Sequence, residues 1–222
     1  MTITHTTIED LDTIRELFGL AIQYQQSKAA NHWHGMDEAL IKREIGEHLH
    51  WKIVEEGIVE EKMMREKMMR EKRMVAGRGR VREQALPAIV CFFSVAFADS
   101  LVWDERDADP SLYLHRIITN PAFRGRGYVK HIIAWAESFG AAAGKRYIRL
   151  DTHVDNQRLN AYYQECGFVF CGVKKFDGQE GNPGVPRHYL GSGLSLYERE
   201  IPIDAFVQDV SGSFKMTPNA DS

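Results

Sequence analysis

The chain has 222 residues, of which 44% are hydrophobic and 27% charged, and its formal net charge is −3. A chain of this length buries roughly 70% of its unfolded surface, so it needs neither disulfides nor a structural metal to hold a core. Its three cysteines are too few and too odd in number for a secreted disulfide framework. The chain starts without a basic and apolar leader, and no apolar run approaches the roughly 18 residues of a membrane helix. These features predict a cytoplasmic globular protein, with one domain over 1–202 and a partly flexible polar extension over 203–222.

Positive charge is concentrated in two segments. Residues 111–176 contain ten Lys and Arg against four Asp and Glu, a net charge of +6, so the rest of the chain carries −9. Residues 60–82 contain nine Lys and Arg against four Glu, a net charge of +5. Either segment can attract a polyanion, and the local geometry decides which of them can hold one.

Two amphipathic helices are predicted at the start of the chain. Apolar residues recur at a spacing of three to four from Ile8 to about Gln25. A polar segment over 27–35 interrupts this pattern, and Asp37 then opens a second helix. The apolar face of the second helix is expected to consist of Leu40, Ile41, Ile45 and Leu49.

A charged insertion is predicted between the next two strands, which are expected at 51–57 and 88–97 because these runs are rich in β-branched and aromatic residues. The insertion spans 60–86 and repeats Glu-Lys-Met-Met-Arg at 61–65 and 66–70. A period of five residues advances about 500° around a helix, so the methionines spread over its faces instead of forming one apolar stripe. The pattern favours an exposed insertion. An arm that binds a partner or nucleic acid is the alternative.

The second half of the chain alternates strands and helices around a glycine-rich turn. A helix is expected from this turn, at 124–127, to Gly144. A shorter helix over 156–166 ends at Gly167, which suits the left-handed residue after a helix. Strands are expected at 112–119, 147–151, 168–173 and 194–199. The whole pattern predicts a mixed α/β (α+β) fold.

The turn Arg124-Gly125-Arg126-Gly127 lies where a strand gives way to a helix. Free backbone N–H groups and the positive end of the helix dipole therefore point in the same direction. Glycine lets the backbone approach phosphate oxygens without a Cβ, and the nearby Arg and Lys side chains add attraction. A Rossmann-type dinucleotide site needs a third glycine, where this chain has Lys130. The segment predicts a pyrophosphate site of another kind.

A second motif lies in the helix expected at 156–166. Asn156 and Tyr163 are seven residues apart and share one helix face, and Tyr163 stands four residues before Gly167. Together with the glycine turn, this motif resembles the GNAT acyltransferase superfamily over about residues 112–176. In that superfamily the motif of the turn ends in Gly or Ala, whereas this chain has Val129 at that position.

The resemblance implies a GNAT fold, which is a mixed and mostly antiparallel central sheet flanked by helices, here with the charged insertion between strands two and three. It implies acetyl-CoA as the donor substrate and no metal. The residues implied to bind the coenzyme are Ile117, Ile118 and Thr119 on a strand, Arg124, Gly125, Arg126, Gly127, Tyr128, Val129 and Lys130 in the turn and helix, and Asn156.

The resemblance also implies direct attack of a primary amine on the thioester, with Tyr163 as the general acid that protonates the leaving thiolate. The alternative interpretation of Tyr163 is an aromatic residue of the core with no role in catalysis. The amine has to lose a proton, and Asp151 at a strand end is the first candidate for the general base. The alternative for Asp151 is to cap a turn. His115 is the second candidate base, and its alternative is a structural histidine.

Other chemistries are disfavoured. Cys166 has no dedicated His partner in the pattern, so a thiol nucleophile is not expected. The pairs His32/His34 and His48/His50 lack further ligands at metal-binding spacing. The activity that the resemblance implies is N-acetyl transfer to a small-molecule or peptide amine, with a coenzyme-binding module or a nucleic-acid-binding or partner-binding protein as alternatives. A membrane and nucleic acid are disfavoured as partners, and a homodimer is left open.

Overall fold

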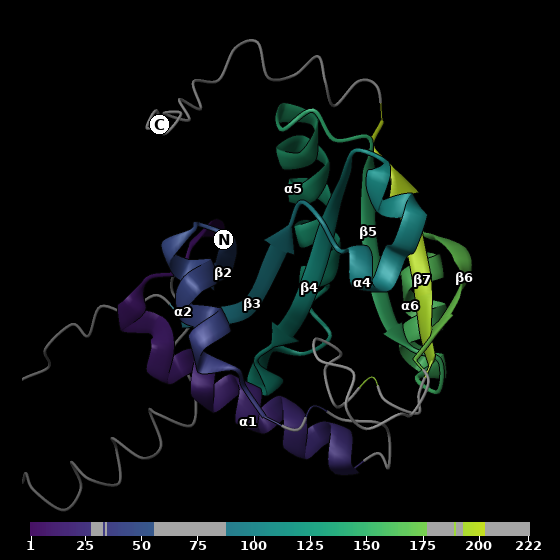
Figure 1. Cartoon of the computed structure of the whole chain (residues 1–222). Helices are drawn as coiled ribbons and strands as arrows, with labels where there is room; N and C mark the ends of the chain where they lie inside the picture. The colour runs from purple at the N-terminus through teal and green to yellow at the C-terminus, as the bar shows by residue number, and fades with distance from the viewer. Residues whose placement is uncertain (28–32, 34, 56–87, 177–188, 190–192, 203–222) are drawn as a thin grey trace, which may run out of the picture. The chain divides into compact units, whose positions relative to one another are not determined.

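The computed structural model of the chain describes residues 1–27, 33, 35–55, 88–176, 189 and 193–202 (Figure 1). The insertion predicted over 60–86 and the extension predicted over 203–222 lie outside the described residues. Most of the polar segment between the first two helices also lies outside them.

The predicted helices and strands are present in the described part of the chain, with β1 and α4 in addition. The strands are β1 (Thr2–His5), β2 (His50–Glu55), β3 (Ala88–Ala96), β4 (Ser111–Thr119), β5 (Tyr147–His153), β6 (Val169–Lys175) and β7 (Gly193–Glu200). The helices are α1 (Leu11–Ser27), α2 (Glu38–Gly46), α4 (Ser100–Trp103), α5 (Tyr128–Ala142) and α6 (Gln157–Glu165), with 3-10 turns at Ile8–Asp10, Asp104–Ala108 and Pro121–Phe123. Among the described helices, none is long and apolar enough to cross a membrane.

The strands form one mixed sheet in the order β1-β2-β3-β4-β5-β7-β6 (Figure 1). The pairs β1–β2, β2–β3, β5–β7 and β6–β7 are antiparallel. β4 and β5 are parallel, and their pairing runs from Ser111 opposite Tyr147 to Tyr113 opposite Arg149. A crossover through α5 connects these two strands, as a parallel pair requires. The predicted fold class, a mixed and mostly antiparallel sheet with flanking helices, is confirmed.

The chain divides into two compact units, Met1–Val95 with His115–Tyr128, and Ala96–Leu114 with Val129–Ser222. In the first unit, α1 and α2 turn their apolar stripes toward β3 and β4, as the three-to-four periodicity predicted. The buried residues of this core are Ile14, Leu17, Phe18, Ile41, Ile45, Phe92 and Ile118.

In the second unit, α4 and the closing strands enclose a separate core. Its buried residues are Val102, Trp103, Tyr113, Phe176, Leu194 and Leu196. The helix α5 approaches the chain closely at Gly140, where an added Cβ would lie 2.7 Å from the Ile201 side chain. Glycine at this position therefore permits close packing of α5.

The first two helices are shorter at one end than predicted. Ile8 lies in a 3-10 turn and its side chain is exposed, so α1 begins only at Leu11. The turn is closed by a capping box in which Asp10 Oδ2 accepts a 2.7 Å hydrogen bond from Thr7 N. The second helix is shorter at its C-terminal end. α2 ends at Gly46, so Leu49, which was predicted on its apolar face, lies after the helix.

Candidate active site

The predicted pyrophosphate turn immediately precedes α5 and has the backbone that such a site needs. Gly125 and Gly127 have φ of +84° and +76°, in the left-handed region where other residues are strained. A Cβ built at either glycine has no neighbouring atom within 4 Å, so open space adjoins the turn. The turn leads directly into the N-terminus of α5, whose first N–H groups and dipole favour an anion.

Three cationic side chains flank the turn at the surface. Arg126 Nη1 lies 3.4 Å from Glu55 Oε2, a long and exposed contact that leaves the guanidinium able to bind another anion. The Arg124 guanidinium lies 3.9 Å from the centre of the Tyr24 ring. Lys130 is exposed in the first turn of α5. These positions suit side chains that attract phosphate groups.

Tyr128 and Val129 open α5 and have helical backbone geometry. Val129 therefore occupies a position where the conformational freedom of glycine is not required. Its backbone N–H lies in the first turn of α5, where N–H groups have no acceptor within the helix. Tyr128 is 3% exposed and anchors the beginning of the helix in the protein interior.

The second half of β4 carries the residues implied to contact the pantetheine arm. Ile118 is buried in the core of the first unit, and Thr119 Oγ1 lies 3.8 Å from Cys91 Sγ. Immediately before them, Arg116 has φ of +50°, which is rare for a long side chain. This conformation changes the direction in which the backbone groups from Ile117 onward point.

An ion pair holds Arg116 in this conformation. Its guanidinium contacts the carboxylate of Glu44 on α2 and donates a 2.8 Å hydrogen bond to Ser94 Oγ on β3. The Glu44 side chain is 11% exposed, and burial raises its pKa against the opposing effect of Arg116. Sequence reasoning missed this pair because its members are 72 positions apart and belong to different elements.

Replacing Glu44 with Ala is expected to lower the free energy of unfolding by about 3 kcal/mol, because it leaves the Arg116 charge mostly buried without its partner. The matched control is Glu38→Ala on the same helix. Glu38 pairs with Arg15 and Lys42 through exposed side chains, so its loss should cost less than about 1 kcal/mol. Urea unfolding of both variants measures the difference, and equal costs would contradict the assignment.

The helix α6 positions both residues of the second motif. Asn156 is its N-cap and accepts a 3.2 Å hydrogen bond from a backbone N–H of the first turn. At the other end, Phe168 N donates to Tyr163 O at 3.0 Å, and Gly167 has φ of +84°. This is a Schellman motif, and its apolar contact is the edge-to-face packing of Tyr163 on Phe168, with ring centroids 6.0 Å apart. The Tyr-x-x-x-Gly-Phe pattern therefore encodes the helix end that fixes Tyr163, whose side chain is 6% exposed.

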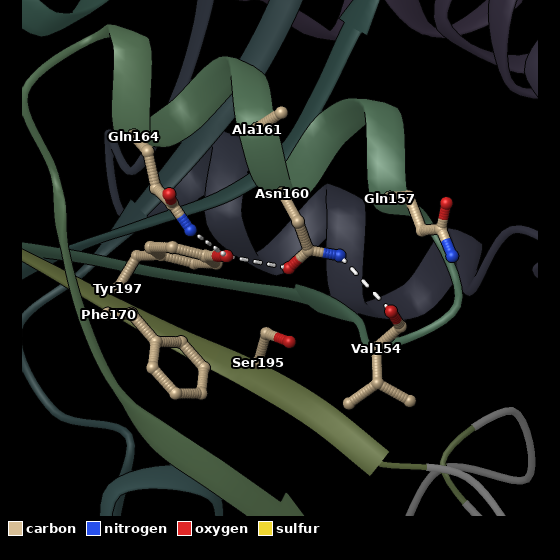
Figure 2. A pocket seen from close by; sticks show the side chains of 8 residues that line it. All are labelled: Val154, Gln157, Asn160, Ala161, Gln164, Phe170, Ser195 and Tyr197. Atoms are coloured by element: carbon tan, nitrogen blue, oxygen red, sulfur yellow. Dashed lines mark hydrogen bonds between the residues drawn. The ribbon is translucent and has the colours of Figure 1, made fainter.

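A hollow of about 380 Å³ opens beside α6 and β7 (Figure 2). Its floor contains a hydrogen-bond chain in which Gln164 donates to the Tyr197 hydroxyl and Tyr197 donates to Asn160. The residues that line it are Val154, Gln157, Asn160, Ala161, Gln164, Phe170, Ser195 and Tyr197. None of these eight is a carboxylate, a histidine or a cation. The hollow was not predicted, because its lining comes from strands and a helix that are distant in sequence.

The first candidate base has a carboxylate neighbour. Asp151 lies on β5 opposite Leu196 of β7, and its side chain is half-buried. A carboxylate oxygen of Asp99 lies within 4.8 Å of one of Asp151. Asp99 was not predicted as a site residue. Its position just after β3 is the one feature of the sequence that could have indicated it.

The second candidate base has a strongly perturbed pKa. Burial and the positive charge of Arg116 lower the pKa of His115 to about 3, so its imidazole is a weak proton acceptor. The thiols are perturbed in the opposite direction. Burial raises the pKa of Cys91 to about 12 and also raises that of Cys171, which keeps both protonated near neutral pH.

Stability is expected to fall on acidification below about pH 6.5. Burial lowers the pKa of His50 to about 4 and that of His115 to about 3, whereas unfolded histidines titrate near 6.5. Between about pH 6.5 and 4 the unfolded chain binds more protons than the folded chain, so unfolding becomes more favourable as pH falls. Thermal unfolding at pH 7, 6 and 5 measures this slope. His50→Gln should flatten it and the exposed His131→Gln should not, and a stability that is level from pH 7 to 5 would contradict the expectation.

Comparisons with known proteins agree with the sequence motifs. A sequence model of the acetyltransferase (GNAT) family matches residues 76–168. The chain is 27% identical over 121 residues to the uncharacterized N-acetyltransferase YesJ of Bacillus subtilis, which covers 54% of this chain and 58% of the relative. It is 30% identical over 79 residues to an aminoglycoside N(6')-acetyltransferase type 1 of Salmonella typhimurium, which covers 34% of this chain and 54% of the relative. The match therefore spans little more than half the length of these curated relatives.

Solved structures share the fold. An acetyltransferase of the GNAT family from Listeria monocytogenes superposes with a TM-score of 0.60 at 21% identity, over 90% of this chain and 94% of that one. Another from Streptococcus agalactiae gives 0.59 at 18% identity, over 90% and 94%. The chain is therefore similar to GNAT acetyltransferases in sequence over residues 76–168, and it shares the fold of solved acetyltransferases of that family.

Proposed function

We propose that the chain transfers an acetyl group from acetyl-CoA to a primary amine. The observation that carries this proposal is the turn before α5, where Gly125 and Gly127 are left-handed and border open space. A turn of this shape at a helix N-terminus fits the pyrophosphate of a coenzyme. Similarity to the GNAT family over residues 76–168 supports acetyl-CoA as the donor that such a turn would hold.

The residues assigned to the coenzyme follow from these local structures. The N–H groups at the start of α5 would bind the pyrophosphate, with Arg124, Arg126 and Lys130 adding charge-assisted contacts. The backbone of β4 after the Arg116 kink, residues 117–119, would bind the pantetheine arm. The N-cap Asn156 would contact the coenzyme through the amide nitrogen that its capping bond does not use.

The chemistry is a direct acyl transfer. The nitrogen of the neutral amine attacks the thioester carbonyl carbon, a C–N bond forms, and the tetrahedral intermediate then breaks its C–S bond. Tyr163 donates its phenolic proton to the departing thiolate. Asp151 takes the proton that the attacking nitrogen loses, with Asp99 as its carboxylate neighbour. We prefer Asp151 to His115 as the base because a histidine of pKa about 3 accepts a proton poorly.

The test is turnover of acetyl-CoA with a panel of primary amines. The panel contains a polyamine, an aminoglycoside, free amino acids and a peptide with a free N-terminus. We expect thiol release that depends on the amine, with a mass increase of one acetyl group on the acceptor. Binding of acetyl-CoA without amine-dependent thiol release would instead favour a coenzyme-binding module.

A further inference from the structure

Asn160 is the branching point of the hydrogen bonds beside the α6 hollow (Figure 2). Its side-chain nitrogen donates to His153 O at 3.0 Å and to Asn156 O at 2.8 Å, and it also faces Val154 O at 3.4 Å. Its side-chain oxygen accepts a 2.8 Å bond from the Tyr197 hydroxyl. One amide thus links the turn before α6 to the strand β7. Such a fully bonded polar group restricts the elements that it joins.

The donor side of Asn160 fixes the residue that caps α6. The carbonyl of Asn156 accepts from both the side-chain and the backbone nitrogen of Asn160, at 2.8 and 2.9 Å. Asn156 N in turn donates to His153 O at 3.0 Å, the same carbonyl that Asn160 binds. Asn160 therefore holds the backbone of Asn156, the residue whose side-chain amide is assigned to the coenzyme.

The acceptor side of Asn160 fixes an aromatic ring next to Tyr163. The Tyr197 ring is buried between Tyr163 and Phe170, with centroid distances of 6.1 and 5.8 Å. Its hydroxyl is held by Asn160 and also accepts a bond from Gln164. An aromatic ring whose hydroxyl is hydrogen-bonded moves less than a ring without such a bond, so it restricts the neighbouring Tyr163 side chain more tightly.

The chemistry of the hollow limits what this pair can do. The Tyr197 hydroxyl donates its proton to Asn160 and accepts a hydrogen bond from Gln164, and the lining contains no carboxylate, histidine or cation. A role in proton transfer is therefore disfavoured, and a role in holding other residues in place is favoured.

We propose that Asn160 and Tyr197 are positioning residues for acetyl transfer. Asn160 holds the backbone of Asn156, whose side chain is assigned to the coenzyme. The hydrogen bond of the Tyr197 hydroxyl fixes the Tyr197 ring, which packs against the ring of Tyr163. The proposal rests on the proposed function, because Asn156 and Tyr163 receive their roles there.

Two conservative variants separate the two sides of Asn160. Tyr197→Phe removes the hydroxyl and keeps the ring, so it should lower kcat about five- to tenfold and leave the KM for acetyl-CoA unchanged. Asn160→Asp keeps an acceptor for Tyr197 but sets a carboxylate oxygen against backbone carbonyls. It should weaken coenzyme A binding about tenfold by calorimetry, raise the KM for acetyl-CoA by the same factor and leave kcat within about twofold.

The matched control is Gln157→Leu, on the same helix and the same hollow, which should change neither parameter. Thermal unfolding shows which variants are folded, and Tyr197→Phe alone decides the question if Asn160→Asp does not fold. Unchanged kcat in a folded Tyr197→Phe, or equal effects of both variants on kcat and KM, would overturn the proposal. A wild-type chain without acetyl transfer would instead refute the proposed function, and the proposal with it.

Discussion

Tyr163→Phe is expected to lower kcat by about 10- to 1,000-fold with little change in the affinity for acetyl-CoA. The phenol is the donor assigned to the leaving thiolate, and phenylalanine keeps the ring that packs on Phe168 and Tyr197. The loss should therefore appear in the chemical step and not in binding or folding. Steady-state kinetics with the best amine of the panel, together with calorimetry of coenzyme A binding, measures both quantities.

The neighbouring tyrosine provides the control for this variant. Tyr162 lies on the same helix with its ring centroid 6.1 Å from that of Tyr163, and burial raises the pKa of Tyr162 to about 12. Tyr162→Phe should leave kcat within about twofold, since that hydroxyl has no assigned role in the reaction. Unchanged turnover in Tyr163→Phe would remove Tyr163 from the mechanism and leave it as a core aromatic residue.

Gly127→Glu is expected to abolish measurable coenzyme A binding. The substitution places a Cβ and a carboxylate in the open space beside the turn, where the pyrophosphate is assigned. Loss of charge-assisted hydrogen bonds and repulsion between like charges should weaken binding by more than about 100-fold. Calorimetric titration with coenzyme A measures the loss.

Gly144→Glu is the matched control, because it reproduces the strain without touching the proposed site. Gly144 follows the opposite end of α5, has φ of +68° and also borders open space. Both variants should lose about 1 to 2 kcal/mol of stability from the left-handed backbone. Only Gly127→Glu should lose coenzyme binding. Retained binding in Gly127→Glu would place the pyrophosphate elsewhere.

Features encoded by neighbours in sequence were predicted well. The glycine turn at 124–127 leads into a helix, as its sequence predicted, and Gly167 has the left-handed conformation expected after α6. Asn156 caps α6 and Tyr163 lies in its last turn, where the sequence predicted a helix over 156–166. Capping and turn preferences act within a few residues, so the sequence displays them directly.

Features that depend on distant contacts were not predicted. The left-handed Arg116 depends on Glu44 and Ser94, which lie on α2 and β3. The link between Asn160 and Tyr197 joins residues 37 positions apart. The strand β1 and the helix α4 have four residues each, too few for periodicity to identify them.

The basic segment 111–176 shows why charge counts need a structure. Arg149 is 1% exposed and lies 2.6 Å from Glu198 and 2.7 Å from Asp109, so its charge is neutralised inside the second unit. Arg116 is likewise paired with Glu44. Neither of these two cations is placed to attract a polyanion, although both contribute to the net charge of the segment. The attraction assigned here comes from the surface cations beside the glycine turn.

The proposed function depends on the turn before α5 holding the pyrophosphate of acetyl-CoA. Calorimetric titration of the chain with acetyl-CoA and with S-acetylpantetheine, which has the same thioester without the pyrophosphate and nucleotide, tests it most directly. We predict that acetyl-CoA binds at least about 100-fold more tightly, and that Gly127→Glu reduces this ratio to near one. Equal affinities for the two thioesters in the wild-type chain would contradict a pyrophosphate site at this turn.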